Sequence, residues 1–245
     1  MSSPVFLYMT CQLGAERALK DEVTRWRPDL RFAFGRPGLL TFKVPGALSE
    51  PLEVPCVFAR VSGLALGRAS VAEDVVSLVT GFVAPGSTLR FHAHARDVAR
   101  PGDEPPGWSR HAAAAAFLGD AVPVLVERGY TVLPTNARAE PGQRIVDVIG
   151  GDPGEPFLVG TRVCGSYGHA HPGGHTPVEM PLHSPSRAYV KMEEALAWSR
   201  APVMAGDHAV ELGSAPGGAA LALVERGVHV TGVDPGVMDA RVLAH

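Results

Sequence analysis

The sequence predicts an α+β region over its first 168 residues, followed by the opening of a doubly wound, parallel α/β sheet. Two observations carry this prediction. Short apolar runs alternate with two helical segments in the front part, and the last 60 residues show the order strand, glycine-rich turn, helix, strand. The chain has 245 residues, 46% hydrophobic and 19% charged, a composition typical of a globular protein with a buried core.

Cysteine content and charge restrict the class of protein further. The three cysteines, Cys11, Cys56 and Cys164, are odd in number and far apart, which argues against a disulfide framework. The N-terminal residues lack a signal-peptide pattern and no apolar run approaches the ~20 residues of a membrane span, so we expect a cytoplasmic protein with no membrane partner. Residues 1–100 hold 12 Lys/Arg against 9 Asp/Glu, and residues 101–245 hold 10 against 16. This imbalance favours an RNA-facing front module and chance scatter about equally.

The first expected domain, residues 1–84, is a small α+β sandwich. Apolar residues at helical spacing predict its helices, and apolar runs bounded by Gly or Pro predict its strands. Ser70 and Glu73 stand at the N-cap and capping-box positions of the second helix. The expected elements are a strand at Val5–Met9, a helix at Ala15–Trp26, strands at Leu39–Val44 and Val57–Leu66, and a helix at Val71–Val83.

The second expected domain, residues 85–168, contains a helix that Pro123 should kink or split. Residues 169–185, rich in Gly, Pro and His, are predicted to be a linker. Its histidines could ligate a transition metal, but we expect no metal site because no Cys or carboxylate stands at a firm ligand spacing and a loop holds ligand geometry poorly. The expected elements of the second domain are a strand at Thr88–Ala95, a loop at Arg100–Gly107, a helix at Ser109–Arg128, and strands at Ile145–Ile149 and Phe157–Val163.

One face of the strand at Thr88–Ala95 is a candidate RNA contact. Arg90 and Arg96 alternate with apolar residues, together with His92 and His94, so all four side chains should lie on the same face. With Arg100 beyond the strand, this face can contact RNA phosphates. The alternative is a polar strand face that is merely exposed to solvent.

The segment 186–245 is the predicted opening of the parallel sheet. Its glycine-rich turn follows a strand, and the glycines allow close approach of a ligand to the backbone. The spacing Gly213-x-x-x-Gly217-Gly218 matches neither a dinucleotide fingerprint nor a P-loop. The expected elements are a helix at Arg187–Trp198, a buried strand at Ala209–Leu212, a helix at Gly217–Arg226, a strand at Val228–Val233, and a helix from Gly236.

Asp234 lies 21 residues after Gly213, at the end of the second strand of this segment. A carboxylate in that position can accept hydrogen bonds from the two hydroxyls of a ribose. Together with the turn, it fits the adenosine and methionine parts of S-adenosylmethionine. The alternative is that Asp234 is a helix N-cap beside Pro235.

Three motifs, SRAYVKMEEA (186–195), ELGSAPGG (211–218) and VDPG (233–236), resemble the FtsJ/RrmJ-like ribose 2′-O-methyltransferases. The similarity is greatest to the RlmM type, which methylates a cytidine 2′-hydroxyl in 23S ribosomal RNA. The resemblance implies an N-terminal ferredoxin-like domain at 1–84, a THUMP-like RNA-binding domain at 85–168 and a partial Rossmann-like methyltransferase domain at 186–245.

The resemblance also implies roles for particular residues. Lys191 matches the first lysine of the family's Lys-Asp-Lys-Glu catalytic set, and Asp234 would bind the cofactor ribose. The residues implied to line the methionine side of S-adenosylmethionine are Gly213, Ser214, Ala215, Pro216, Gly217 and Gly218.

Three departures from the family pattern stand beside these implications. Ala188 and Ala219 replace a serine and an aromatic residue that are frequent in the family, and the later catalytic Asp, Lys and Glu are expected beyond His245. We therefore expect a fragment of a longer enzyme. The alternatives are a non-catalytic THUMP-type RNA-binding protein with a vestigial methyltransferase domain, and a small-molecule methyltransferase with an unrelated front domain.

Overall fold

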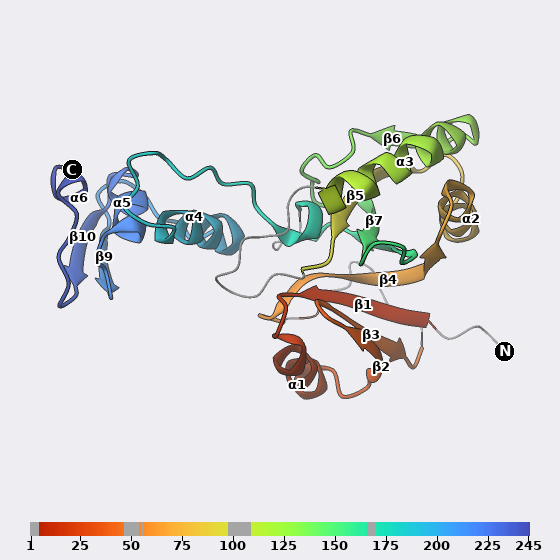
Figure 1. The fold of residues 1–245 in the computed structure, drawn as a ribbon, viewed down its shortest axis with the longest axis horizontal. Helices are drawn as coiled ribbons and strands as arrows, with labels where there is room; N and C mark the ends of the chain where they lie inside the picture. Colours follow the sequence, from red (N-terminus) through yellow and green to blue (C-terminus); the bar gives the residue numbers. More distant parts are fainter. Residues whose placement is uncertain (1–4, 47–53, 55, 98–108, 166–169) are drawn as a thin grey trace. The chain divides into compact units, whose positions relative to one another are not determined.

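The computed structural model describes residues 5–46, 54, 56–97, 109–165 and 170–245, without the side chains of 109–112 (Figure 1). The chain divides into two compact units, residues 1–175 and 176–245. The division falls within the segment 169–185 that was predicted to be a linker. The loop predicted at 100–107 lies outside the described residues.

The front unit is built on one eight-stranded sheet in the order β2-β3-β1-β4-β8-β7-β5-β6. Its neighbouring strands are antiparallel, except that β5 runs parallel to both β6 and β7. The strands are β1 (Val5–Cys11), β2 (Arg31–Arg36), β3 (Leu39–Val44), β4 (Ala59–Ala69), β5 (Thr88–Ala95), β6 (Thr131–Leu133), β7 (Arg144–Gly150) and β8 (Phe157–Val163). The helices are α1 (Glu16–Trp26), α2 (Ala72–Phe82), α3 (Ser109–Glu127) and the short 3-10 helix η1 (Pro172–Gly174).

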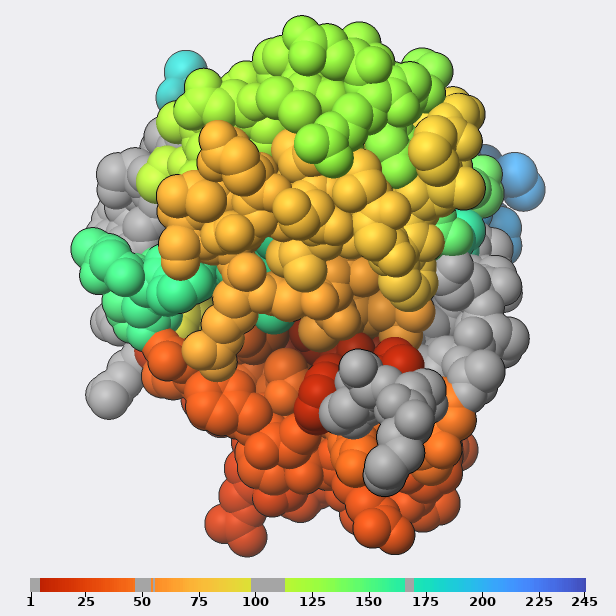
Figure 2. Space-filling view, turned by 90° about the vertical axis from the view of Figure 1, so that its right-hand side faces the viewer, coloured from red at the N-terminus to blue at the C-terminus, as the bar shows by residue number. Residues whose placement is uncertain are grey.

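Two apolar cores hold the helices against this sheet. Leu19 and Val23 of α1 pack against β1 and β3, as their i, i+4 spacing predicts (Figure 1). Helices α2 and α3 lie side by side over the other half of the sheet (Figure 2). Val79 of α2 and Leu125 of α3 are fully buried in the core that the two helices form with the sheet. Burial of such side chains stabilises the unit by about 1.5–3 kcal/mol each.

The predicted strands and helices of this unit are all present, three of them (39–44, 88–95 and 157–163) with the predicted ends and the others with shifted ends, and the sequence reasoning missed two strands. β2 was missed because its sequence, RFAFGR, mixes charges and glycine with the apolar residues, and β6 because it has only three residues. Pro123 lies inside α3, which continues through it and is not split.

The start of α2 corrects the predicted cap. Val71, and not Ser70, stands at the N-cap position. The carboxylate of Asp74 accepts hydrogen bonds from the backbone N–H groups of Ser70 (2.8 Å) and Val71 (3.2 Å), so the capping acid is Asp74 and not Glu73. The apolar pattern located the helix correctly. Glu73 and Asp74 are adjacent acids, and only the backbone geometry at the helix start decides which of them caps it.

The strands of the two predicted front domains form the two halves of one continuous sheet, which meet where β4 pairs with β8. β4 pairs with β1 on one side and with β8 on the other. The boundary predicted at residues 84/85 therefore does not divide the strands into two sheets, and the assignment of ferredoxin-like and THUMP-like domains stays a prediction.

The rear unit has the predicted strand–turn–helix–strand order. β9 and β10 are parallel neighbours, with His208 opposite His229 and Leu212 opposite Val233, and α5 connects them. Its elements are α4 (Ala188–Ser199), β9 (His208–Leu212), α5 (Gly218–Val224), β10 (His229–Val233) and α6 (Ala240–Leu243). The described chain is thus mixed α and β throughout, in agreement with the predicted fold class.

β9 is not the buried strand that its apolar sequence predicts. Val210 and Leu212 are largely exposed, whereas Ala209 and Glu211 on the opposite face are half-buried. The backbone N–H of Ala220, in α5, bonds to Glu211, so α5 lies on that half-buried face. Separately, within the described part of the chain no helix is long and apolar enough to span a bilayer.

Candidate cofactor site

The turn between β9 and α5 contains two glycines that differ in their surroundings. Gly213 and Gly217 have φ angles of +78° and +106°, in the left-handed region that glycine adopts without strain. A Cβ added to Gly213 would meet nothing within 4 Å, so there is open space beside this backbone. At Gly217 an added Cβ would instead overlap Met238. Gly213 is therefore the position where a ligand can approach, and Gly217 serves packing.

Asp234, at the end of β10, is hydrogen-bonded to the glycine turn. One carboxylate oxygen accepts from the backbone N–H of Ala215 (2.9 Å), and the other accepts from that of Gly236 (2.6 Å). Helix α6 begins only at Ala240, with Asp239 as its N-cap. The alternative assignment of Asp234 as a helix N-cap is therefore wrong. Each of its oxygens keeps a further lone pair that can accept a hydrogen bond.

Glu211 adds a second carboxylate next to the turn. Its Oε2 is buried and lacks a hydrogen-bond partner among the described residues. Burial, with a smaller contribution from the negative charge of Asp234, raises the pKa of Glu211 against the opposing hydrogen bond from Ala220. A buried acceptor without a partner costs about 1–3 kcal/mol, which makes it a place where a donor group of a ligand would bind favourably.

Helix α4 begins beside the glycine turn. Tyr189 donates a hydrogen bond to Glu225 (2.7 Å), and Glu193 pairs with Arg226, so this side of α4 lies against α5. Lys191 is exposed and lies about 200° around the helix from Tyr189, on the other side. The structure therefore does not bring Lys191 into contact with α5, and its catalytic role stays a prediction.

Ser186, which the sequence analysis did not single out, fixes the approach of α4. A Cβ at Gly218 would overlap Ser186 Oγ and lie 2.8 Å from the Ser186 carbonyl oxygen. We expect Gly218→Ala to destabilise the rear unit by about 1–3 kcal/mol, because the backbone at Ser186 cannot give way as a flexible side chain would. Urea unfolding measures this. Gly119→Ala is the control, since nothing lies within 4 Å there and the usual helix preference should stabilise by about 0.5–1 kcal/mol. Equal effects of the two substitutions would contradict the close packing.

Arg90 of β5 and Arg96, directly after the strand, are buried, which corrects the prediction of a phosphate-binding strand face. Arg90 is 7% exposed and donates to Gln143 (3.0 Å) and to the carbonyl of Pro134 (3.0 Å). Arg96 is 4% exposed and pairs with Asp152 (2.8 Å) and Glu155 (3.0 Å). Arg100 lies outside the described residues.

The histidines on the same face of β5 belong to a buried polar cluster. Asp147 of β7 accepts from Arg162 Nε (2.7 Å) and from the Tyr8 hydroxyl (2.6 Å), and His94 Nε2 lies 3.3 Å from it. Arg162 Nη2 lies 3.1 Å from His92 Nδ1, and His92 Nε2 lies 3.0 Å from the Ala137 carbonyl. An arginine can only donate, so Nδ1 of His92 must accept and Nε2 must carry the proton.

The charges in this cluster compensate one another. Burial alone would raise the pKa of Asp147, but the charge of Arg162 and the hydrogen bond from His94 outweigh it and hold the pKa well below its usual range. Burial lowers the pKa of His92 to about 4, so this imidazole is neutral at pH 7. The polar side chains of β5 thus form part of a buried network that links β5, β7, β8 and β1.

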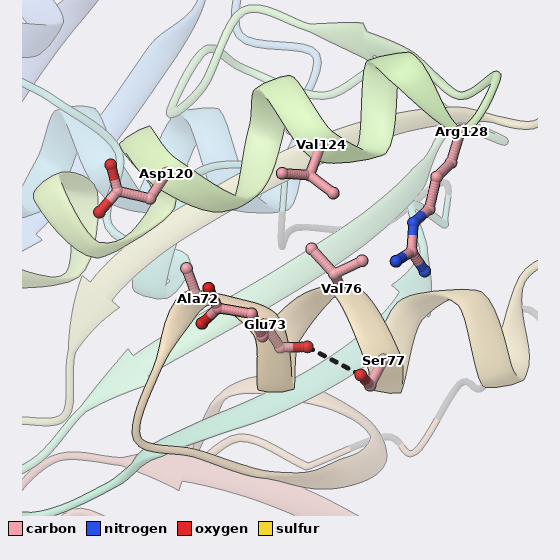
Figure 3. Close-up of a pocket in the computed structure, with 7 residues that line it drawn as sticks. All are labelled: Ala72, Glu73, Val76, Ser77, Asp120, Val124 and Arg128. Atoms are coloured by element: carbon pink, nitrogen blue, oxygen red, sulfur yellow. Dashed lines mark hydrogen bonds between the residues drawn. The ribbon is translucent and has the colours of Figure 1, made fainter.

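A small pocket between α2 and α3 is separate from these features (Figure 3). Val76 and Val124 face each other across it, and Ser77 donates to the Glu73 carbonyl (2.8 Å). Its lining residues are Ala72, Glu73, Val76, Ser77, Asp120, Val124 and Arg128. It holds none of the predicted site residues. Within the described ranges, no group of three His, Cys, Asp or Glu side chains is arranged to hold a metal ion.

Comparison with known proteins finds sequence relatives for part of this chain. It is 40% identical over 85 residues to ribosomal RNA large subunit methyltransferase M of Alkalilimnicola ehrlichii, covering 32% of this chain and 23% of that protein. It is 44% identical over 68 residues to the protein of the same name from Halorhodospira halophila, covering 26% and 20%. The resemblance to RlmM-type enzymes is thereby confirmed as a sequence similarity. The matches span about a fifth to a quarter of the curated relatives' length, and no family model matches the chain.

Solved structures give more distant likenesses. TrmN from Thermus thermophilus is 15% identical, with a TM-score of 0.44, covering 98% of this chain and 67% of that one. A possible methylase from Clostridium difficile 630 is 12% identical, with a TM-score of 0.40, covering 92% and 56%. Likenesses of this size assign no function.

Proposed function

We propose that this chain is part of an S-adenosylmethionine-dependent methyltransferase that modifies ribosomal RNA. The observation that carries the proposal is the turn after β9, which is open at Gly213 and tied to β10 by Asp234. The partial similarity to ribosomal RNA methyltransferases supports the same conclusion. The finer proposal is transfer to a cytidine 2′-hydroxyl of 23S RNA, in the cytoplasm.

The residues at the turn fit this cofactor. The open backbone at Gly213 leaves space for a ligand, Asp234 keeps acceptor capacity for ribose hydroxyls, and the unpartnered Oε2 of Glu211 suits the ammonium group of a methionine moiety. When bound, S-adenosylmethionine supplies an electrophilic methyl group on its sulfonium. The proposed role of Lys191 is to orient the ribose hydroxyl or take up its proton.

Calorimetric titration of S-adenosylmethionine into the chain tests the proposal. We expect saturable one-to-one binding, and at least about a 10-fold weaker affinity for Asp234→Ala, since each lost charge-assisted hydrogen bond is worth about 1.5–3 kcal/mol. Asp207→Ala is the matched control. Asp207 accepts a backbone hydrogen bond from Met204 (2.8 Å) immediately before β9, at the strand end away from the turn, so affinity should be unchanged.

The outcomes separate the three candidate functions. Absence of cofactor binding, with RNA binding retained, would favour the RNA-binding protein with a vestigial methyltransferase domain. Cofactor binding without any RNA binding would favour a small-molecule methyltransferase. Equal affinities of the Asp234→Ala and Asp207→Ala variants would remove Asp234 from the site.

A further inference from the structure

The edge strand β2 exposes aromatic rings among positive charges. It is the outermost strand of the eight, beside β3 and next to α1 (Figure 1). Its Phe32 and Phe34 are 43% and 40% exposed, although aromatic side chains normally contribute to cores. Among the described residues, neither ring belongs to the buried apolar clusters of the unit, whereas Phe42 of β3 does.

A register shift between Phe32 and Phe34 places the two rings on opposite sides of the sheet edge. Phe32 stands opposite Phe42, on the side covered by α1, and its ring meets that of Phe42 edge-on with centroids 6.1 Å apart. The ammonium group of Lys20, from α1, lies 4.0 Å from the centroid of the Phe32 ring. Phe34 stands opposite Thr41 on the other side.

Each ring has at least one cation within 6 Å of its centroid. The guanidinium groups of Arg36 and Arg68 lie 5.6 and 5.8 Å from the centroid of Phe34. Arg31 and Lys43 are opposite each other in the β2–β3 register, and both are exposed. Arg36 also pairs with Glu155. The edge group, defined as Lys20, Arg31, Phe32, Phe34, Arg36, Lys43 and Arg68, therefore combines five cations with two accessible rings.

Lysine, arginine and a bulge on an edge strand also discourage pairing with other sheets. That role explains the cations and the register shift, but it does not explain the rings, because exposed phenylalanine on an edge promotes the association that edge charges suppress. Aromatic rings interleaved with cations are the combination that binds unpaired nucleic acid, with bases stacked on rings and phosphates beside cations.

We propose that the edge group of β2 binds a single-stranded segment of RNA, with bases stacked on Phe32 and Phe34. The inference rests on the proposed function, from which it takes RNA as the substrate class. It assigns RNA recognition to this edge in place of the strand face of β5, whose arginines are buried.

Fluorescence anisotropy tests the proposal with a labelled RNA of about 20 nucleotides containing only adenine and cytosine, which cannot pair with itself. The double variant Phe32→Leu/Phe34→Leu keeps apolar bulk but loses the stacking surface, and we expect its affinity to fall at least about fivefold. The control is Phe82→Leu, a phenylalanine of similar exposure (48%) at the end of α2. The same RNA annealed to its complement should bind the unaltered chain more weakly, since its bases are not free to stack.

The salt dependence gives a second readout. Affinity falls as salt rises, and each phosphate contact on a single strand contributes about 0.7 to the steepness of log affinity against log salt. The double variant Arg31→Gln/Arg68→Gln should therefore make this dependence less steep by about 1.4, whereas Arg128→Gln should not change it. Urea unfolding of each variant checks the fold. RNA binding that is unchanged in the Phe32→Leu/Phe34→Leu variant, or equal for single strand and duplex, overturns the inference and leaves the methyltransferase proposal standing. If the chain binds no RNA, the inference also fails, and cofactor titration of the same preparation tests the proposed function separately.

Discussion

Asp147→Asn is expected to destabilise the front unit by about 3–5 kcal/mol, the usual cost of leaving one member of a buried ion pair without its partner. Arg162 is 5% exposed and would keep its charge in a site where its main acceptor has become neutral. The Tyr8 hydroxyl would lose the same acceptor. Urea unfolding followed by circular dichroism measures the difference in the free energy of unfolding.

Asp152→Asn is the matched control for this prediction. Asp152 also pairs with a buried arginine, Arg96, but its own side chain is 55% exposed and water can replace it. Its substitution should cost no more than about 1 kcal/mol. A loss below 1 kcal/mol for Asp147→Asn would show that Arg162 reaches another acceptor or water, and that the cluster does not hold the sheet together.

Acid should destabilise the same unit in two separate pH ranges. The pKa of His92 is lowered by burial from 6.5 to about 4, so between these values the unfolded chain binds a proton that the folded chain does not. Stability therefore falls as the pH falls from 6.5 to 4, by at most about 3 kcal/mol. Below about pH 4 the lowered pKa of Asp147 adds to the loss, because the unfolded carboxylate takes up a proton first.

Unfolding free energies measured in steps from pH 7 to about pH 4 test the contribution of His92. In His92→Asn the side chain no longer titrates, so the slope in this range should become much smaller. His171, whose pKa is also lowered by burial, would leave a residual slope of the same sign. An unchanged slope in His92→Asn would mean that the imidazole is accessible to water and not held neutral by burial.

The candidate cofactor site was largely predictable because its signals are local. A strand, a turn with Gly213 and Gly217, and an acid at the end of the next strand all fall within about two dozen residues, and β9, α5 and β10 follow that order. Gly213 and Gly217 have the positive φ angles for which glycine is suited, and Asp234 lies at the turn. The hydrogen bonds of Asp234 to Ala215 and Gly236 depend on backbone positions that no residue pattern specifies.

The burial of the polar face of β5 was not predictable in the same way. The alternation in β5 correctly places Arg90, His92, His94 and Arg96 on one face, but alternation cannot tell whether that face meets water or protein. The residues that cover it come from distant segments, including Pro37, Pro134 and Asp147. β2 was not predicted as a strand, and its aromatic residues Phe32 and Phe34 are exposed because the sheet ends there.

By itself, the sequence determined the order of most strands and helices, the glycine turn with its acid, and the similarity to RNA methyltransferases, because each depends on neighbouring residues. Only the tertiary structure decided which polar side chains are buried and which aromatic side chains are exposed. The physical reason is that burial of a charge is tolerated only where partners compensate it, as Asp147 does for Arg162, and those two side chains meet through the pairing of β7 with β8.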